Sequence, residues 1–199
     1  FNFKPIMKFK ILLFNVILFL GCNPEEKVEL NLLDYVPQNT IATFYINDFR
    51  MVENTIDNVS FFKNILKLKN DLYDDISLIL SNEINYKGIL NITEEGKDNY
   101  AVTFIFKQNI NDSLQNFILE TFIYNSVPIS IEKDGSKKVY NTLINNIRIK
   151  SSSQLVVENI IRNVKNKKRG IQDERFFRLA NVRNKNAPLN IFFHKKIGD

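Results

Sequence analysis

The chain has 199 residues, of which 44% are hydrophobic and 25% charged, so it can form one folded domain with a substantial core. It holds one histidine and one cysteine, which argues against a zinc site and against a catalytic triad built on histidine. The formal net charge of +5 is unevenly distributed, because residues 150–199 carry 12 basic and 4 acidic side chains, whereas residues 22–149 are net acidic.

The N-terminal segment, residues 7–22, has the layout of a secretory signal sequence. Residues 7–10 form a short basic start and residues 11–20 form an apolar run. Gly21 and the sole cysteine, Cys22, follow directly. The run is too short to span a bilayer as a helix, which takes about 20 residues. We therefore expect residues 7–21 to be a cleaved export signal.

The end of this segment, Phe19-Leu20-Gly21-Cys22, resembles the lipobox of bacterial lipoproteins. In that family the cysteine thiol receives a diacylglycerol, and a peptidase cuts the chain just before the cysteine. The resemblance implies lipidation at Cys22, cleavage between Gly21 and Cys22, and attachment to a membrane of the cell envelope, with the outer membrane expected. The alternative is an unmodified cysteine that follows a membrane helix or a buried helix.

The sequence "LLDYVPQNTIATFYINDF", residues 32–49, also resembles the opening of large uncharacterised bacterial envelope lipoproteins. This resemblance implies a location and no activity. The expected organisation is an upstream read-through over residues 1–6, the signal peptide over 7–21, a polar tether over 22–29 and one domain over 30–199. A continuation of the gene beyond Asp199 stays open.

The periodicity and turn signals predict the order β-α-α-β-β-α-β-β-α-α-β within the domain. The predicted strands cover residues 40–47, two segments of 87–108 joined at Glu95-Gly96, two segments of 127–150 joined at Asp134-Gly135, and 188–194. The predicted helices cover residues 49–57, 60–82, 111–124, 154–168 and 173–184. Paired strands with tight turns predict an α+β domain, with amphipathic helices on a largely antiparallel sheet. Strands that are apolar on both faces, at 40–47 and 101–107, indicate that both sheet faces are covered.

The last two predicted helices carry most of the positive charge. The candidate residues for an anionic-partner face are Arg162, Lys165, Lys167, Lys168, Arg169, Arg175 and Arg178, continued by Arg183 and Lys185. Such a face fits lipid headgroups, a polysaccharide or an acidic protein. The alternative is the solvated side of two amphipathic helices. A nucleic-acid partner fits an envelope protein poorly.

The remaining candidate residues have weaker patterns. His194 is expected to be a solvated histidine at a strand end. Asp71, Asp74 and Asp75 could gather around a cation, but we expect an exposed helix face, hence no metal and no cofactor. The triplet Asp112-Ser113-Leu114 resembles an O-glycan acceptor motif, which makes Ser113 a candidate glycosylation site.

These observations predict a lipid-anchored envelope protein that is an interaction or assembly module and not an enzyme, with no catalytic residue assigned. One alternative is a module that binds a small or lipidic ligand between sheet and helices. A second alternative is a hydrolase with paired carboxylates, which meet only in three dimensions. A pocket with convergent polar groups would favour the alternatives, and an exposed apolar or basic face would favour the interaction module.

Overall fold

A computed structural model of the chain describes residues 31–50, 70–81, 83, 85–97, 99–108 and 120–194. Several predictions lie outside these residues: the signal and tether with Cys22, most of the helix at 49–57, the first part of the helix at 60–82, and Ser113. Residues 49 and 50 are described and are helical, as predicted.

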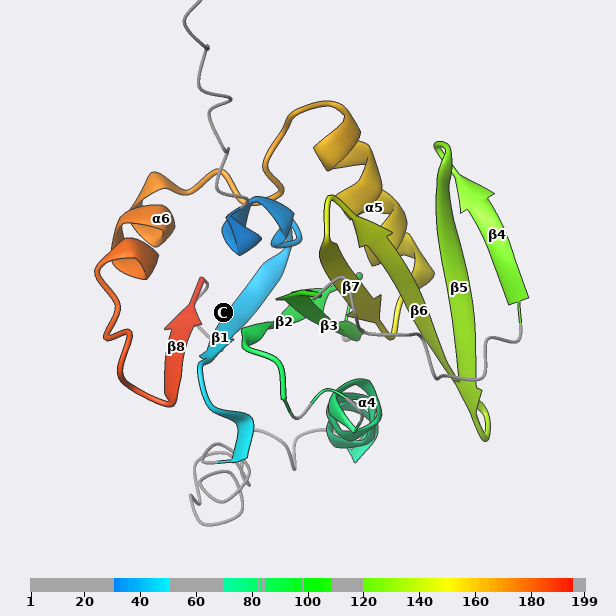
Figure 1. The fold of residues 1–199 in the computed structure, drawn as a ribbon, viewed down its shortest axis with the longest axis horizontal. Helices are drawn as coiled ribbons and strands as arrows, with labels where there is room; N and C mark the ends of the chain where they lie inside the picture. Colours follow the sequence, from blue (N-terminus) through cyan, green and yellow to red (C-terminus); the bar gives the residue numbers. More distant parts are fainter. Residues whose placement is uncertain are drawn as a thin grey trace, which may run out of the picture.

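The described residues form one open, eight-stranded antiparallel sheet (Figure 1). Its strands are β1 (Thr40–Ile46), β2 (Gly88–Glu94), β3 (Tyr100–Lys107), β4 (Glu120–Tyr124), β5 (Val127–Asp134), β6 (Lys137–Ile144), β7 (Ile147–Ser151) and β8 (Leu189–Phe193). The spatial order is β4-β5-β6-β7-β3-β2-β1-β8, so β4 and β8 are the edges. The described helices are the short 3-10 helix η1 (Leu32–Tyr35), α4 (Asn70–Leu80), α5 (Gln154–Lys165) and α6 (Glu174–Asn181).

Helices cover both faces of this sheet, as the doubly apolar strands predicted. In β3, Phe104 and Phe106 point to the face that packs against α4. Ala101 and Ile105 point to the opposite face, which α5 and η1 cover, and α6 covers the same face farther along, over β1 and β2. Alternate residues of one strand therefore belong to two separate cores, because successive side chains of a strand point to opposite faces.

The α+β class and the antiparallel sheet are confirmed, and so are the positions of β1, β8, α5, α6 and the turns after β2 and β5. The predicted helix at 111–124 is wrong over its described part, because residues 120–124 form the edge strand β4. Asn125 and Ser126 both have positive φ (47° and 62°), which makes the tight two-residue turn that pairs β4 with β5. The segment "TFIY" suits a strand as well as a helix, and this turn decides between them.

The predicted strand pair after residue 126 is also wrong in number, because the chain makes three strands there. Asn145 and Asn146, with φ of 51° and 63°, form a second turn of the same kind, and it separates β6 from β7. Asparagine tolerates the left-handed region better than most residues, so an Asn-Asn pair serves here without glycine. The predicted order of elements is therefore not the observed one.

Candidate functional site

The basic helices α5 and α6 are amphipathic. Their buried side chains are Val156, Val157, Ile160, Ile161, Phe176, Phe177 and Ala180. The seven predicted anionic-partner residues are all exposed, so they lie on the solvent side of these helices or in the connection between them. Exposure alone leaves open which of these charges are available to a partner.

Several of these cations are already paired within the chain. Arg169 donates to Asp34 over 2.8 Å and stacks on the Phe177 ring, with 4.6 Å to its centroid. Arg175 is paired with Asp173 at 3.2 Å, and its hydrogen bond lowers the pKa of the Asp173 carboxyl. Arg162 donates to the Tyr124 hydroxyl over 2.9 Å. These arginines act within the fold.

The three lysines at the end of α5, Lys165, Lys167 and Lys168, are different. All three are exposed, and none forms an ion pair within the part of the chain that the structure describes. We call them the lysine tip. The helix ends in a Schellman-type turn, in which the Lys168 N–H donates to the Asn163 carbonyl over 2.8 Å and the Lys167 N–H to the Val164 carbonyl over 3.0 Å. Lys167 has φ of 53°, where glycine is the favoured residue.

The lysine tip lies beside the point where the N-terminal segment enters the domain. The connection from α5 to α6 passes along η1 (Figure 1), and the Arg169–Asp34 pair joins the two. Gly170 makes this close approach possible, because a Cβ there would lie 2.2 Å from the Val36 carbonyl oxygen.

His194, predicted to be solvated, is half-buried at the end of β8. Its Nε2 lies 2.8 Å from the Thr43 hydroxyl oxygen, and its ring lies 4.4 Å from that of Phe176. The Thr43 hydroxyl donates to the Asn91 side-chain oxygen over 3.0 Å, so Nε2 is the donor to Thr43. Burial lowers the pKa of His194, although Asp173 opposes this. His194 therefore packs against Phe176 and hydrogen-bonds to Thr43 and is not a solvated side chain.

This burial predicts a pH dependence of stability. The native state disfavours protonated His194, so its contribution is complete above the ordinary pKa of 6.5 and is lost as the pH falls from there through the lowered pKa of the folded protein. Urea unfolding of the wild type and of His194→Gln should show this loss in the wild type alone. Glutamine keeps a donor for Thr43 but does not titrate. Parallel pH profiles of the two proteins would contradict the assignment.

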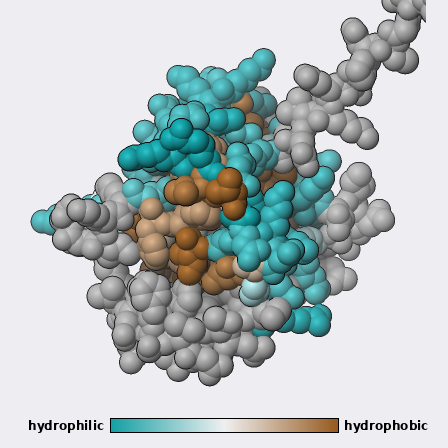
Figure 2. Space-filling model, turned by 90° about the vertical axis from the view of Figure 1, so that its left-hand side faces the viewer, coloured by the Kyte–Doolittle hydropathy of each residue, from teal (hydrophilic) through white to brown (hydrophobic). Residues whose placement is uncertain are grey.

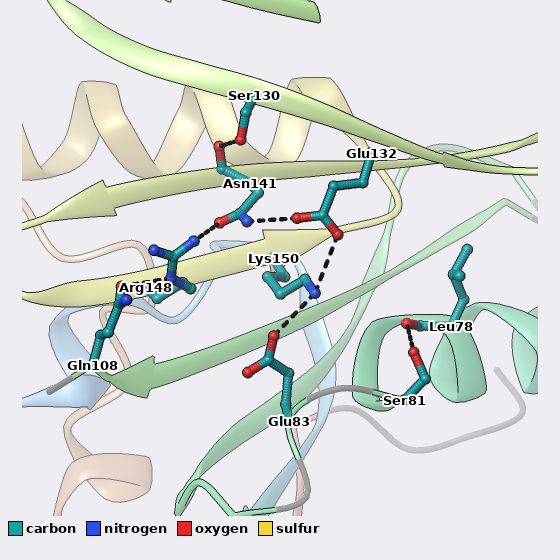
Figure 3. A network of polar contacts seen from close by, with 9 residues as sticks. All are labelled: Leu78, Ser81, Glu83, Gln108, Ser130, Glu132, Asn141, Arg148 and Lys150. Atoms are coloured by element: carbon teal, nitrogen blue, oxygen red, sulfur yellow. Dashed lines mark hydrogen bonds and ion pairs between the residues drawn. The ribbon is translucent and has the colours of Figure 1, made fainter. Parts of the chain in front are cut away.

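A network of buried charges joins the segment that follows α4 to β5, β6 and β7 (Figure 3). The Lys150 ammonium, 1% exposed, lies 3.0 Å from Glu83 and 3.4 Å from Glu132. The Asn141 amide donates to Glu132 over 2.9 Å and accepts from Arg148 over 3.0 Å. Lys150 thus meets two carboxylates, and Asn141 links Glu132 to Arg148. A buried ion pair needs such additional hydrogen bonds to offset its desolvation. The network acts as a structural tie between the helix end and the sheet.

Sequence reasoning missed this network. The available signal was "IRIK", residues 147–150, where two basic residues alternate with isoleucines in a strand-like run. Such a pattern places both cations on one sheet face. Their partner Glu83 lies 67 positions away from Lys150, and the sequence does not indicate it.

Two grooves lie on the surface of the described residues. One, of about 320 Å³, lies between α5 and the segment before β1, and Gln38, Asn39, Asn159 and Arg162 are among its lining residues. Glu95 borders it and accepts a hydrogen bond from Ser153, the N-cap of α5. This groove was not predicted.

The other groove, of about 430 Å³, lies between α4 and the β5–β6 turn and includes Asp74 and Lys137. Lys137 lies 2.7 Å from Asp75 and 3.7 Å from Asp74, so these acids pair with a lysine. The side chain of Asp71 lies outside the description. No three metal-ligating side chains come together among the described residues.

An apolar surface occupies the side of the molecule that carries α6 and β8 (Figure 2). Leu179 is 57% exposed, Val182 79% and Phe193 45%. These residues are on α6, at its C-cap and in the edge strand β8. Leu179 and Val182 lie on the outer side of α6, whereas Phe193 alternates with Phe192 in β8 and therefore points to the sheet face opposite α6. Exposed large side chains of this kind commonly mark interaction surfaces. The helical periodicity of α6 places Leu179 on its outer side, so this signal was readable from the sequence.

Comparisons of the chain with protein-family models, with curated proteins and with solved structures find no match. None of the helices within the described residues is long and apolar enough to cross a membrane.

Proposed function

We propose that this chain is a lipid-anchored protein of the bacterial cell envelope that works as a non-catalytic interaction or assembly module. The location is supported by the order of features in residues 7–22, where a basic start and an apolar run precede Gly21 and the sole cysteine. A diacylglyceryl group, with a further acyl chain, holds a protein stably at a bilayer, whereas one chain holds it weakly.

The kind of activity is supported by one observation, the apolar surface on α6 and β8. Leu179 and Val182 are exposed on α6 and Phe193 on the edge strand β8, where a partner can pack against them. The two grooves described above have mixed polar and apolar linings, which suits the binding of a ligand less well than a deep apolar pocket does.

One experiment tests both the lipid anchor at Cys22 and the contact of the apolar surface with a partner. The full chain is expressed in a Gram-negative host, with and without Cys22→Ser, and carries a photoreactive residue at Val182 or, as a control, at Leu143 on β6. We expect the wild type to begin at an acylated Cys22 by intact mass spectrometry and to form discrete cross-linked products from position 182 only. Leu143 is also exposed, at 44%, but lies away from the proposed surface.

An unacylated wild type that fractionates like Cys22→Ser would overturn the anchor. An acylated wild type with equal cross-linking from positions 182 and 143 would keep the anchor and overturn the interaction surface.

The polar groove beside α5 favours the alternative of a ligand-binding module. Its amides and Arg162 offer donors and acceptors to a small polar molecule rather than to a lipid chain. A hydrolase would need two free carboxylates across the groove, and Glu95 is engaged by Ser153. A small polar molecule that binds this groove saturably in the wild type, and no longer binds in Asn159→Leu, would favour the ligand-binding module over the interaction module.

A further inference from the structure

We propose that the lysine tip, Lys165, Lys167 and Lys168, docks on anionic phospholipid headgroups of the bilayer that carries the anchor. The inference rests on the proposed lipid anchor at Cys22 and adds to it a second contact, which fixes the orientation of the domain on the membrane.

The positive charges of the lysine tip are available to a partner outside the domain. Three ammonium groups fall within four residues, all are exposed, and the neighbouring Arg169 supplies the internal ion pair to Asp34 instead of them. Lysine is a compact, flexible point charge, which suits a disordered layer of headgroups, whereas arginine suits planar bidentate partners. Arg162, Arg169 and Arg175 thus have partners within the chain, whereas the lysines of the tip are exposed and form no ion pair among the described residues.

The lysine tip also lies close to the place where the N-terminal segment enters the domain. The first described residue, Asn31, caps η1, and η1 contacts the α5–α6 connection through Asp34. Eight residues lie between Cys22 and Asn31, so the two ends are at most about 30 Å apart when the chain is fully extended. An anchor at Cys22 therefore keeps the entry point, and with it the neighbouring lysine tip, within reach of the bilayer.

The electrostatic attraction of an anionic bilayer is large enough to favour the docked state of the lysine tip. A lysine near an anionic membrane favours the docked state by about 5-fold, so three lysines together favour it by roughly 100-fold. The attraction declines within about 10 Å at moderate salt, so it acts only on groups that the tether brings to the surface. An acidic protein would have to match the tip in shape as well as in charge, whereas a lipid surface requires charge alone.

The backbone conformation of Lys167 is one that favours glycine over lysine. This residue adopts the left-handed conformation at a position where glycine costs least. A lysine there places a charge at the outermost turn of the helix end at a cost in stability. A partner for that charge compensates the cost.

The test measures lysine acetylation in the lipidated full chain, reconstituted in vesicles of phosphatidylcholine alone or mixed with phosphatidylglycerol. In the anionic vesicles we expect slow acetylation of the lysine tip, relieved by high salt. Lys133 and Lys138, exposed beside the β5–β6 turn, should react equally in both lipids. Lys167→Gln with Lys168→Gln should lower the protection of Lys165 by about 30-fold, whereas Lys133→Gln with Lys138→Gln should leave it unchanged.

The outcomes separate this inference from the anchor. Loss of the wild type from neutral vesicles would overturn the anchor proposal. Retention on both vesicles with equal acetylation of the tip would keep the anchor and overturn docking. Protection of the tip in native membranes but not in lipid vesicles would assign the surface to a protein and overturn the lipid proposal.

Discussion

Replacing Lys150 by methionine should lower the free energy of unfolding by about 3–5 kcal/mol. The substitution keeps the length of the side chain but leaves Glu83 and Glu132 buried on the α4 side of the sheet without the cation between them. Burying an unpaired charge costs far more than an ion pair gains, because the lost hydration has no replacement. Denaturant unfolding followed by circular dichroism measures the difference.

The matched control is Lys137→Met, which breaks ion pairs to Asp74 and Asp75 at the surface of the same region. Exposed pairs contribute about 0–1 kcal/mol, so this variant should stay close to the wild type. The triple variant Lys150→Met, Glu83→Gln, Glu132→Gln should recover most of the loss, since neither carboxylate is then left charged without Lys150. Equal losses from Lys150→Met and Lys137→Met would refute the buried network as a main source of stability.

Gly170→Ala should cost about 3 kcal/mol of stability, the second largest expected effect. The added Cβ would lie 2.2 Å from the Val36 carbonyl oxygen and 3.1 Å from the Gln38 nitrogen, both of them backbone atoms. Neither can move away as a flexible side chain would, so the connection from α5 to α6 must shift away from η1. Thermal and denaturant unfolding measure the loss.

Gly135→Ala is the control for Gly170→Ala. Gly135 has φ of 59° in the β5–β6 turn, and a Cβ there meets no atom within 4 Å. Alanine in the left-handed region costs roughly 1–2 kcal/mol through the backbone alone. A smaller loss from Gly170→Ala than from Gly135→Ala would show that the contact with η1 relaxes easily and does not hold the connection in place.

The predictions for Lys150 and for His194 concern contacts that local sequence patterns do not encode. Lys150 meets Glu83 across 67 positions, and His194 meets Thr43 across 151. The histidine was expected to be solvated because strand ends usually face water. Packing of the Phe176 ring from α6 against it reverses that expectation.

Local sequence patterns were enough to predict α5, α6, β1, β8 and the turn at Asp134-Gly135, because helical periodicity, capping residues and turn chemistry act between near neighbours. Tertiary structure decided that residues 120–124 pair as a strand, since their side chains suit either state and the partner β5 stabilises only one. It also decided which cations are available. Asp34 and Asp173 neutralise Arg169 and Arg175, while the lysine tip keeps its charge exposed, because an ion pair depends on which distant side chains the fold brings within reach.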